Sequence, residues 1–263
     1  MGILNITPDS FSDGGLHFNK SAAVDRAMMM VDEGADIIDI GGESSRPGAE
    51  PVSREEELMR TVPVIETLAE KINVPISIDT YKSEVAEKAL SAGAAIVNDI
   101  SGMRFDAQMA AVVSRHKVPV VIMHMRGNPK NMQANPVYEA LVTEIMDYFR
   151  MSIRAAVKFG IAEEMIILDP GIGFGKTPEH NLEILNNLQE FARLGKPLMV
   201  GPSRKAFIGK ILSDAPTSER VEGTAATVAV SIMKGANIVR VHDVREMAKV
   251  AKVADAIKRE RIL

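Results

Sequence analysis

Three polar side chains stand where short apolar runs of this chain end, and their types suit the recognition of a flat, nitrogen-rich ring. A carboxylate can accept two parallel hydrogen bonds from an N–C–N–H edge, which aminopyrimidines and pterins present. Capping of the following helix is the alternative role for any one of them, above all for Asp79, but it explains the three together poorly. The three are Asp79 after residues 76–78, Asn98 after residues 95–97 and Asp169 after residues 165–168.

Basic side chains follow the last two apolar runs. An isolated basic residue is usually solvated surface, but a guanidinium, an ammonium and an imidazole together can hold a phosphate-like anion. Alternation along a strand places Arg240 and His242 on the same face. The sequence therefore predicts an anion site here. Its members are Arg204 and Lys205 after residues 198–200, and Arg240 and His242 after residues 238–239.

Metal binding leaves a fainter trace. Asn5 ends the first apolar run, and its amide oxygen suits Mg²⁺, an ion that binds largely through waters and substrate phosphates. A zinc site is not expected, because the chain has no cysteine and its five histidines show no i,i+4 pairing. His124 also ends a run, but it fits a hydrogen-bonded core histidine equally well. Alternation points Asp99 away from Asn98, so we assign Asp99 a structural role.

The elements that position these residues repeat about eight times: a short apolar run, as in a buried parallel strand, and then a helical stretch. Roughly 33 residues per repeat is the size of one unit of a (β/α)8 barrel. An open doubly wound sheet is the structural rival, but its glycine-rich fingerprint is absent after the first run. We predict an α/β fold, a (β/α)8 TIM barrel of one domain over residues 1–263. The helical stretches are 20–33, 53–71, 82–92, 107–116, 138–159, 178–192, 218–234 and 244–259.

Local signals agree with these elements. In the fifth stretch, five apolar residues at i+4 steps predict one buried stripe; they are Leu141, Ile145, Phe149, Ile153 and Val157. Ser53 with Glu56 forms a possible capping box, and Thr177 caps a helix whose first residue is proline. Glycines 34, 93, 160 and 235 are expected to end helices. The loops 7–18 and 41–52 are long and rich in Gly, Ser, Pro and Asp, which is typical of lids.

Composition excludes several classes of protein. With 46% hydrophobic residues, 263 residues can bury a large core. A net charge of −4 argues against a nucleic-acid partner, which selects a basic face. No apolar stretch reaches membrane-spanning length, so no membrane association is expected. The absence of cysteine suits the reducing cytoplasm, where we expect the protein.

The chain resembles the dihydropteroate synthase family nearly end to end. The first of the matching segments, joined to Ser203–Lys205, is highly specific, whereas the segment 77–80 alone also occurs in related pterin-binding methyltransferases. The matching segments are residues 2–15, 39–48, 77–80, 97–100, 123–125, 168–176, 203–205 and 240–243. Position 45 is Ser where many members carry Thr, which keeps the hydroxyl group.

The resemblance implies that 4-aminobenzoate is joined to 6-hydroxymethyl-7,8-dihydropterin diphosphate with release of diphosphate. It implies a pterin site of Asp79, Asn98, Met123, Asp169, Phe174, Lys205 and Arg240, of which Asp79, Asp169, Lys205 and Arg240 are expected to be catalytic. It places the diphosphate against Asn5 with Mg²⁺ and against Arg46, Arg240 and His242. It places 4-aminobenzoate against Phe11, Ser45, Pro47, Ser203 and Lys205, with a weaker role for Asp13 in metal binding or loop closure.

The reaction fits the residue types, because a charge-neutralised diphosphate leaves without a protein nucleophile, and we expect an SN1-like substitution. The resemblance also implies a homodimer and inhibition by sulfonamides. Two alternatives remain: a pterin-binding methyltransferase barrel acting on methyltetrahydrofolate, and a non-catalytic pterin- or phosphate-binding barrel. The first would not need the basic cluster, and the intact set of loop residues argues against the second.

Overall fold

The computed structural model describes residues 1–6, 16–44 and 48–261, and of residues 16–19 it describes the backbone only. Within these residues, strands and helices alternate along the chain, and every strand pairing is parallel. The strands are β1 (Gly2–Asn5), β2 (Ile38–Gly41), β3 (Ile76–Asp79), β4 (Ile96–Asp99), β5 (Val120–Met123), β6 (Ile166–Asp169), β7 (Met199–Val200) and β8 (Ile238–Val239).

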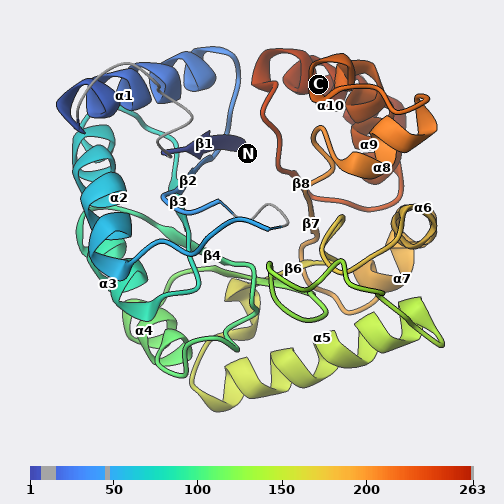
Figure 1. Ribbon diagram of the computed structural model, residues 1–263, viewed down its shortest axis with the longest axis horizontal. Helices are drawn as coiled ribbons and strands as arrows, with labels where there is room; N and C mark the ends of the chain where they lie inside the picture. The colour runs from blue at the N-terminus through green and yellow to red at the C-terminus, as the bar shows by residue number, and fades with distance from the viewer. Residues whose placement is uncertain (7–15, 45–47, 262–263) are drawn as a thin grey trace.

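The strands close into a barrel, which confirms the predicted (β/α)8 fold. Strands β1 to β6 form one sheet in chain order, and β7 pairs with β8. Single parallel bridges join the two groups at both seams, between Leu168 and Leu198 and between Gly2 and Val241. At the second seam, the amide of Ile3 donates to the carbonyl of Val241 at 2.9 Å. Figure 1 shows the helices as a ring outside the strands.

The helices follow the strands as a βα repeat requires. They are α1 (Leu16–Asp32), α2 (Arg54–Ala69), α3 (Ser83–Ser91), α4 (Met109–His116), α5 (Leu141–Lys158), α6 (Pro178–Asn186), α7 (Leu188–Ala192), α8 (Ala206–Ile211), α9 (Val221–Met233) and α10 (Val244–Arg259). The single stretch expected over 178–192 is two helices that meet at Asn187. Helix α8 was not predicted, because six residues are too few to show a helical period.

The predicted helix ends are largely confirmed. Glycines 34, 93, 160 and 235 all have positive φ directly after a helix. At Gly93, where φ is +115°, a Cβ atom would stand 2.6 Å from Cβ of Ala69, so only glycine fits. Thr177 caps α6 by accepting from the amide of His180, which returns a bond through its ring.

The other capping box forms only in part. The Ser53 hydroxyl accepts from the amide of Glu56 at 3.1 Å, but the Glu56 carboxylate pairs with Arg60 rather than returning to the cap.

The apolar stripe of α5 is shorter than its sequence spacing indicated. Leu141, Ile145 and Phe149 are buried, Ile153 is half-buried, and Val157 is 40% exposed. Each i+4 step turns about 40° beyond a full circle, since a helix has 3.6 residues per turn. Four such steps therefore leave the buried face, and the prediction was wrong at its last member.

The barrel interior is packed in layers, as in other barrels of this size. Its lower part is apolar and contains Met1, Val121, Ile167 and Met199. One layer closer to the carboxyl ends of the strands, the register aligns Asn5 with Gly41, Gly41 with Asp79, and Asp79 with Asn98. A row of inward polar side chains thus lies at one edge of the barrel, above an apolar floor. This is the edge where barrels of this kind carry their active sites.

Candidate active site

The eighth strand brings a guanidinium into the acidic part of this edge. Arg240 follows β8, and its Nε donates to Oδ2 of Asp39 at 2.5 Å while its Nη2 donates to Oδ2 of Asp79 at 2.7 Å. The Arg240 side chain is 18% exposed, and those of Asp39 and Asp79 are 0% and 11% exposed. One cation therefore serves two buried carboxylates, and the cluster carries a net charge of −1 when all three groups are ionised.

The surroundings of Asp79 change the pKa of its carboxyl group. Burial raises the pKa of the Asp79 carboxyl to about 7, and the attraction of Arg240 only partly opposes the effect of burial. The negative charge of Asp39 raises that pKa further. Near neutral pH Asp79 is therefore close to the balance between its protonated and its ionised form, and a ligand that donates N–H groups to Asp79 would favour the ionised form.

Asp39 was not among the residues predicted for the site. Besides Arg240, its Oδ2 accepts from the Nδ2 of Asn98 at 3.1 Å, and its Oδ1 is buried without a hydrogen-bond partner in the described structure. A fully buried Asp within a strand of isoleucines was the available signal, because such a charge needs a partner across the barrel. Asp39 orients both Arg240 and Asn98, while Asp99 is structural as predicted and accepts from the amides of Ser101 and Met103.

The sixth strand presents Asp169 on the other side of the edge. The amide of Gly171 donates to its Oδ1 at 2.7 Å, and the residue is 4% exposed. Burial raises the pKa of this carboxyl above its ordinary value, although the Gly171 amide and the charges of Lys205, Lys176 and Arg240 oppose that rise. Asp169 and Asp79 therefore provide two carboxylate acceptors at the carboxyl edge of the barrel, at the ends of β6 and β3.

An apolar wall lies next to Asp169. Met123 and Phe174 belong to a buried cluster with Ile100, Met125 and Met132. The ammonium of Lys205 lies over the ring of Phe174, 4.2 Å from its centroid, which is a cation–π distance. The structure thus brings together the predicted pterin residues Met123, Phe174 and Lys205, and their arrangement suits a flat ring with a polar perimeter.

The predicted anion residues have different partners in the described structure. The Oγ of Ser203 accepts from the amide of His242 at 3.1 Å and lies 3.0 Å from the Nδ1 of the same histidine, so these two residues form one unit after β7 and β8. Arg204 instead forms a two-point ion pair with Asp243. Arg240 lies among the carboxylates described above, two residues before His242.

His124 proves to be a core residue. It is 7% exposed and packs edge-on against the ring of Tyr148. Burial lowers the pKa of its imidazole to about 2, so the ring is neutral and can accept a hydrogen bond. Its Nδ1 lies 3.0 Å from the ammonium of Lys176.

The donor set around Asn5 suits a magnesium ion held mainly by its substrate. A Cβ atom built on Gly41 would lie 3.7 Å from Oδ1 of Asn5 and 3.6 Å from Oδ2 of Asp79, so both oxygens border the space that this glycine leaves open. Among the described residues, no group of three His, Cys, Asp or Glu side chains could hold a metal ion by itself. Mg²⁺ keeps several waters and binds substrate phosphates, so it needs few oxygens from the protein itself.

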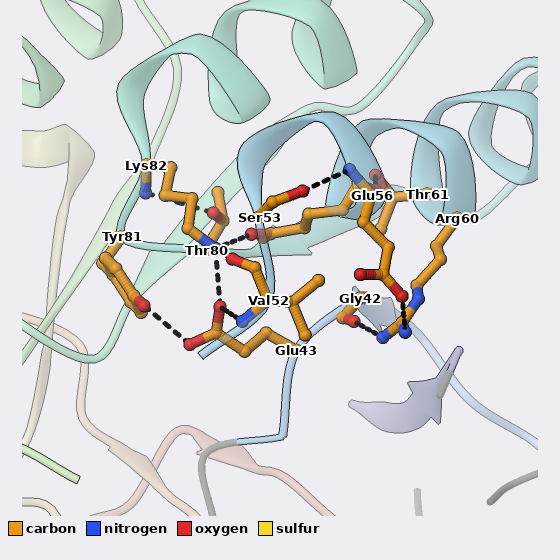
Figure 2. A network of polar contacts seen from close by, with 11 residues as sticks. Gly42, Glu43, Val52, Ser53, Glu56, Arg60, Thr61, Thr80, Tyr81 and Lys82 are labelled. Carbon is orange, nitrogen blue, oxygen red and sulfur yellow. Dashed lines mark hydrogen bonds and ion pairs between the residues drawn. The ribbon is translucent and has the colours of Figure 1, made fainter. Parts of the chain in front are cut away.

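A polar network fixes the two ends of the loop that follows β2 (Figure 2). The ammonium of Lys82 donates to Glu43 and Glu57, both at 2.5 Å, and to the carbonyl of Val52 at 2.8 Å. Glu43 also accepts from the Val52 amide at 3.1 Å and from the Tyr81 hydroxyl at 2.6 Å. Entry and exit of the loop are thereby tied to the segment that follows Asp79. None of these four side chains was predicted to matter.

We expect Lys82→Met to lower the free energy of unfolding by about 2–3 kcal/mol, because it leaves the carboxylate of Glu57, 1% exposed, without its cation. The pKa of Lys82 is raised although burial opposes this, since its bonds to Glu43 and Glu57 outweigh burial. Urea denaturation at pH 7 measures the change. Lys130→Met is the matched control, because its ion pair with Glu50 is exposed. Equal effects of the two variants would contradict this account.

Four residues assigned to the site by resemblance lie outside the described part of the chain: Phe11, Ser45, Arg46 and Pro47. Asp13, to which a weaker role was given, lies outside it as well.

Among the helices that the structure does describe, none combines the length and the apolar character that crossing a membrane requires.

Comparisons with known proteins agree with this geometry. Residues 1–242 match the family described as pterin binding enzyme. A dihydropteroate synthase of Synechocystis is 54% identical over 259 residues, which is 98% of this chain and 90% of that protein. The structure of a Yersinia pestis dihydropteroate synthase with a sulfonamide drug complex superposes with a TM-score of 0.93 at 45% identity, covering 98% of this chain and 94% of that one.

A Xanthomonas albilineans dihydropteroate synthase in complex with 7,8-dihydropteroate gives a TM-score of 0.88 at 38% identity, with 98% and 92% of the two chains covered. The identities hold over nearly the whole length of both partners in each comparison, so the likeness extends over nearly all of this chain. The chain belongs to the pterin-binding enzymes and, within them, to the dihydropteroate synthase family.

Proposed function

We propose that this protein is a transferase of folate biosynthesis that joins 4-aminobenzoate to 6-hydroxymethyl-7,8-dihydropterin diphosphate and releases 7,8-dihydropteroate and diphosphate. The observation that carries the proposal is the pair of largely buried carboxylates, Asp79 and Asp169, at the ends of two strands of the barrel of a chain of this family. The relatives named above, one of them bound to 7,8-dihydropteroate, support the same reaction.

In this proposal the pterin ring lies between the two carboxylates. Asp169 and Asp79 accept its N–H groups, and the amide of Asn98 contributes from a position fixed by Asp39. Met123 and Phe174 line the faces of the ring, with Lys205 at its edge. Arg240, which stays bonded to Asp39 and Asp79, presents the flat face of its guanidinium to the ring.

The diphosphate lies on the side of Asn5, Arg46, Arg240 and His242. Mg²⁺ held by Asn5 and by phosphate oxygens would neutralise charge on the leaving group. His242 is oriented for this by Ser203, which engages both its amide and its Nδ1. Phe11, Ser45, Pro47, Ser203 and Lys205 form the proposed 4-aminobenzoate pocket.

Bond breaking precedes bond making in this scheme. The C–O bond to the diphosphate breaks, and its electron pair leaves with the diphosphate. The resulting cation is conjugated with the dihydropterin ring and is stabilised by the carboxylates of Asp79 and Asp169, which act across a site with little water. The neutral amine of 4-aminobenzoate then forms the C–N bond and gives up one proton. Positioning and electrostatics supply the catalysis, and no protein nucleophile takes part.

Asp79 should show opposite effects on stability and on activity. Its folded pKa of about 7 lies above the ordinary value near 3.9, so the folded state holds this proton more tightly and stability falls as pH rises from about 4 to 7. Asp79→Asn removes the ionised form. We expect it to raise the free energy of unfolding at pH 8 by about 1–2 kcal/mol while it lowers turnover at least about 100-fold.

Urea denaturation of this variant and the wild type at pH 5 and pH 8 measures the first effect. A variant that is less stable than the wild type at pH 8 would contradict the assigned charge balance. Ser77 lies two residues before Asp79 in the same strand, and Ser77→Ala serves as the control for substitution within β3.

A homodimer and a cytoplasmic location are part of the same proposal. Helices α9 and α10, which pack on each other, expose Val230, Met233, Val253 and Ile257. Exposed apolar residues on two adjacent helices are what a second copy of the chain would cover. Sedimentation velocity of the purified protein gives the mass, and Val253→Glu with Ile257→Glu should convert a dimer to monomers.

The activity is tested by incubating the protein with pterin diphosphate and 4-aminobenzoate and measuring diphosphate release and 7,8-dihydropteroate. A sulfonamide should compete with 4-aminobenzoate. Methyl transfer from methyltetrahydrofolate in place of product would support the methyltransferase alternative. Pterin binding without either reaction would leave a non-catalytic binding barrel.

A further inference from the structure

Lys176 is a buried charged residue for which the proposed reaction has no use. It closes the turn that begins at Asp169, and it is 3% exposed. An ammonium has three N–H groups and no acceptor, and burying it without partners is costly. Within the described residues its ammonium forms no ion pair at 4 Å or less, so its partners are neutral groups.

Those partners satisfy the ammonium completely. Its Nζ lies 3.0 Å from Nδ1 of His124, and it donates to the carbonyls of His124 at 3.2 Å and Phe174 at 2.9 Å. Because the imidazole of His124 is neutral, its Nδ1 can accept from the ammonium. Three donors therefore meet three acceptors: two belong to His124, directly after β5, and one is the carbonyl of Phe174.

The ammonium of Lys176 also lies close to Gly171, whose backbone amide orients Asp169. A Cβ atom on Gly171, whose φ is +71°, would stand 3.3 Å from Nζ of Lys176 and 2.0 Å from the carbonyl oxygen of His124. The amide of this same Gly171 donates to Oδ1 of Asp169. Lys176 thus supports the backbone on one side of Gly171 while Asp169 is bound on the other.

We propose that Lys176 is a positioning residue for the pterin site: its ammonium, held by His124 and Phe174, fixes the turn that sets Asp169 and Phe174 against the ring. Its positive charge has a second effect, because it favours the ionised form of Asp169, the form that accepts two N–H bonds. This role rests on the proposed function, since it presupposes that Asp169 and Phe174 bind a pterin.

The pKa directions agree with the geometry. Burial lowers the pKa of Lys176 to about 7, the charge of Asp169 opposes that change, and the charge of Lys205 adds to it. Asp169 faces the cations Lys205, Lys176 and Arg240, and His124 faces Lys176, Arg104 and Arg126. Removing Lys176 takes one cation from Asp169 and raises the pKa of that carboxyl further. Affinity for a pterin should then fall as pH is lowered, beginning at a higher pH than in the wild type.

Lys176→Met tests the proposal, because methionine keeps most of the side-chain length without charge. We expect the KM for the pterin diphosphate to rise about 10-fold or more at pH 8 and the KM for 4-aminobenzoate to change less than about 2-fold. The dissociation constant of free 6-hydroxymethylpterin, measured by calorimetry from pH 5.5 to 8.5, should show a loss relative to the wild type that is larger at pH 6 than at pH 8.5.

A purely structural role gives a different result: an equal loss of pterin affinity at every pH. The melting temperature does not separate the two roles, because Lys176→Met leaves two buried carbonyls and one imidazole nitrogen without their donor in either case; the pH dependence of the affinity does. Lys196→Met is the matched control. That lysine is 11% exposed and pairs with Glu163 at 2.8 Å, ahead of β7 and β6 and thus at the opposite end of the barrel.

Two further variants keep the test decisive if Lys176→Met folds poorly. Lys176→Arg retains the charge and should keep the wild-type pH profile below about pH 7, where Lys176 itself is charged, even if affinity falls. The two Lys176 variants are also compared in an Asp169→Asn background. There the difference in pterin affinity between Lys176→Arg and Lys176→Met should no longer depend on pH, because no carboxylate remains at position 169 to titrate. An unchanged pterin KM and an unchanged pH profile in Lys176→Met would overturn the proposal. A wild-type protein that neither binds pterin nor forms product would instead overturn the proposed function.

Discussion

Replacing Arg240 with methionine should lower the free energy of unfolding by about 3–5 kcal/mol at pH 8 and reduce turnover to background. The guanidinium is the shared partner of Asp39 and Asp79, whose side chains are 0% and 11% exposed. Removing it leaves two buried carboxylates next to each other without a cation. Breaking a buried ion pair from one side costs far more than the pair itself contributes, because the remaining charge stays desolvated.

The size of this loss should depend on pH in a defined direction. Without Arg240, the pKa of Asp79 rises above its present value of about 7, so the folded state takes up protons that the unfolded state releases. The deficit should therefore be smaller at pH 5.5 than at pH 8.5. Urea denaturation at the two pH values measures it.

Two variants bracket the interpretation. Arg240→Lys keeps the charge but not the two-pronged geometry, and should recover part of the stability. Arg204→Met breaks a neighbouring Arg–Asp pair whose arginine is 34% exposed, and should cost about 1 kcal/mol or less. A deficit of similar size for Arg240→Met and Arg204→Met would contradict the central role of the Asp39–Arg240–Asp79 cluster.

The carboxyl edge of the barrel could be predicted from sequence because its signals are local. Asp79, Asn98 and Asp169 each end a short apolar run, and in parallel strands such ends lie at one edge. Helix ends at Gly93 and Gly235 could be predicted for the same reason, since a positive φ after a helix selects glycine.

The partners inside the barrel could not be predicted in this way. Asp39, Arg240 and Asn98 meet across the barrel, 59 or more positions apart in the chain, and no local period announces such a contact. A charge within an apolar strand shows that Asp39 needs a partner but not which one. Lys176 was assigned no role because a lysine after a glycine-rich turn reads as solvated surface, whereas the turn folds it inward.

The network at the base of the loop after β2 was missed for another reason. Lys82 and Glu57 begin or occupy helices, where charged residues are ordinary, and only the approach of α2 to α3 makes them a buried pair. Neither composition nor helix periodicity therefore identifies the residues that hold the two ends of this loop.

Asp169→Asn should weaken pterin binding by about 100- to 1000-fold. An amide offers one oxygen where the carboxylate offers two, and its NH₂ group would face the N–H groups of the ring. Hydrogen bonds to a charged acceptor contribute about 1.5–3 kcal/mol each, so losing one and opposing the other is worth about 3–4 kcal/mol. The turn itself should survive, because the asparagine oxygen can still accept from the Gly171 amide.

Calorimetry with 6-hydroxymethylpterin measures this loss directly, and circular dichroism checks that the fold is intact. Asp99→Asn is the control: it also replaces a buried strand-end carboxylate that accepts backbone amides, but one that points away from Asn98 and the cavity. Asp99→Asn should reduce stability and leave pterin affinity within about 2-fold of the wild type. Near-normal affinity in Asp169→Asn would mean that the ring is bound by other residues. The role of Asp169, at the end of β6, in pterin binding would then be wrong.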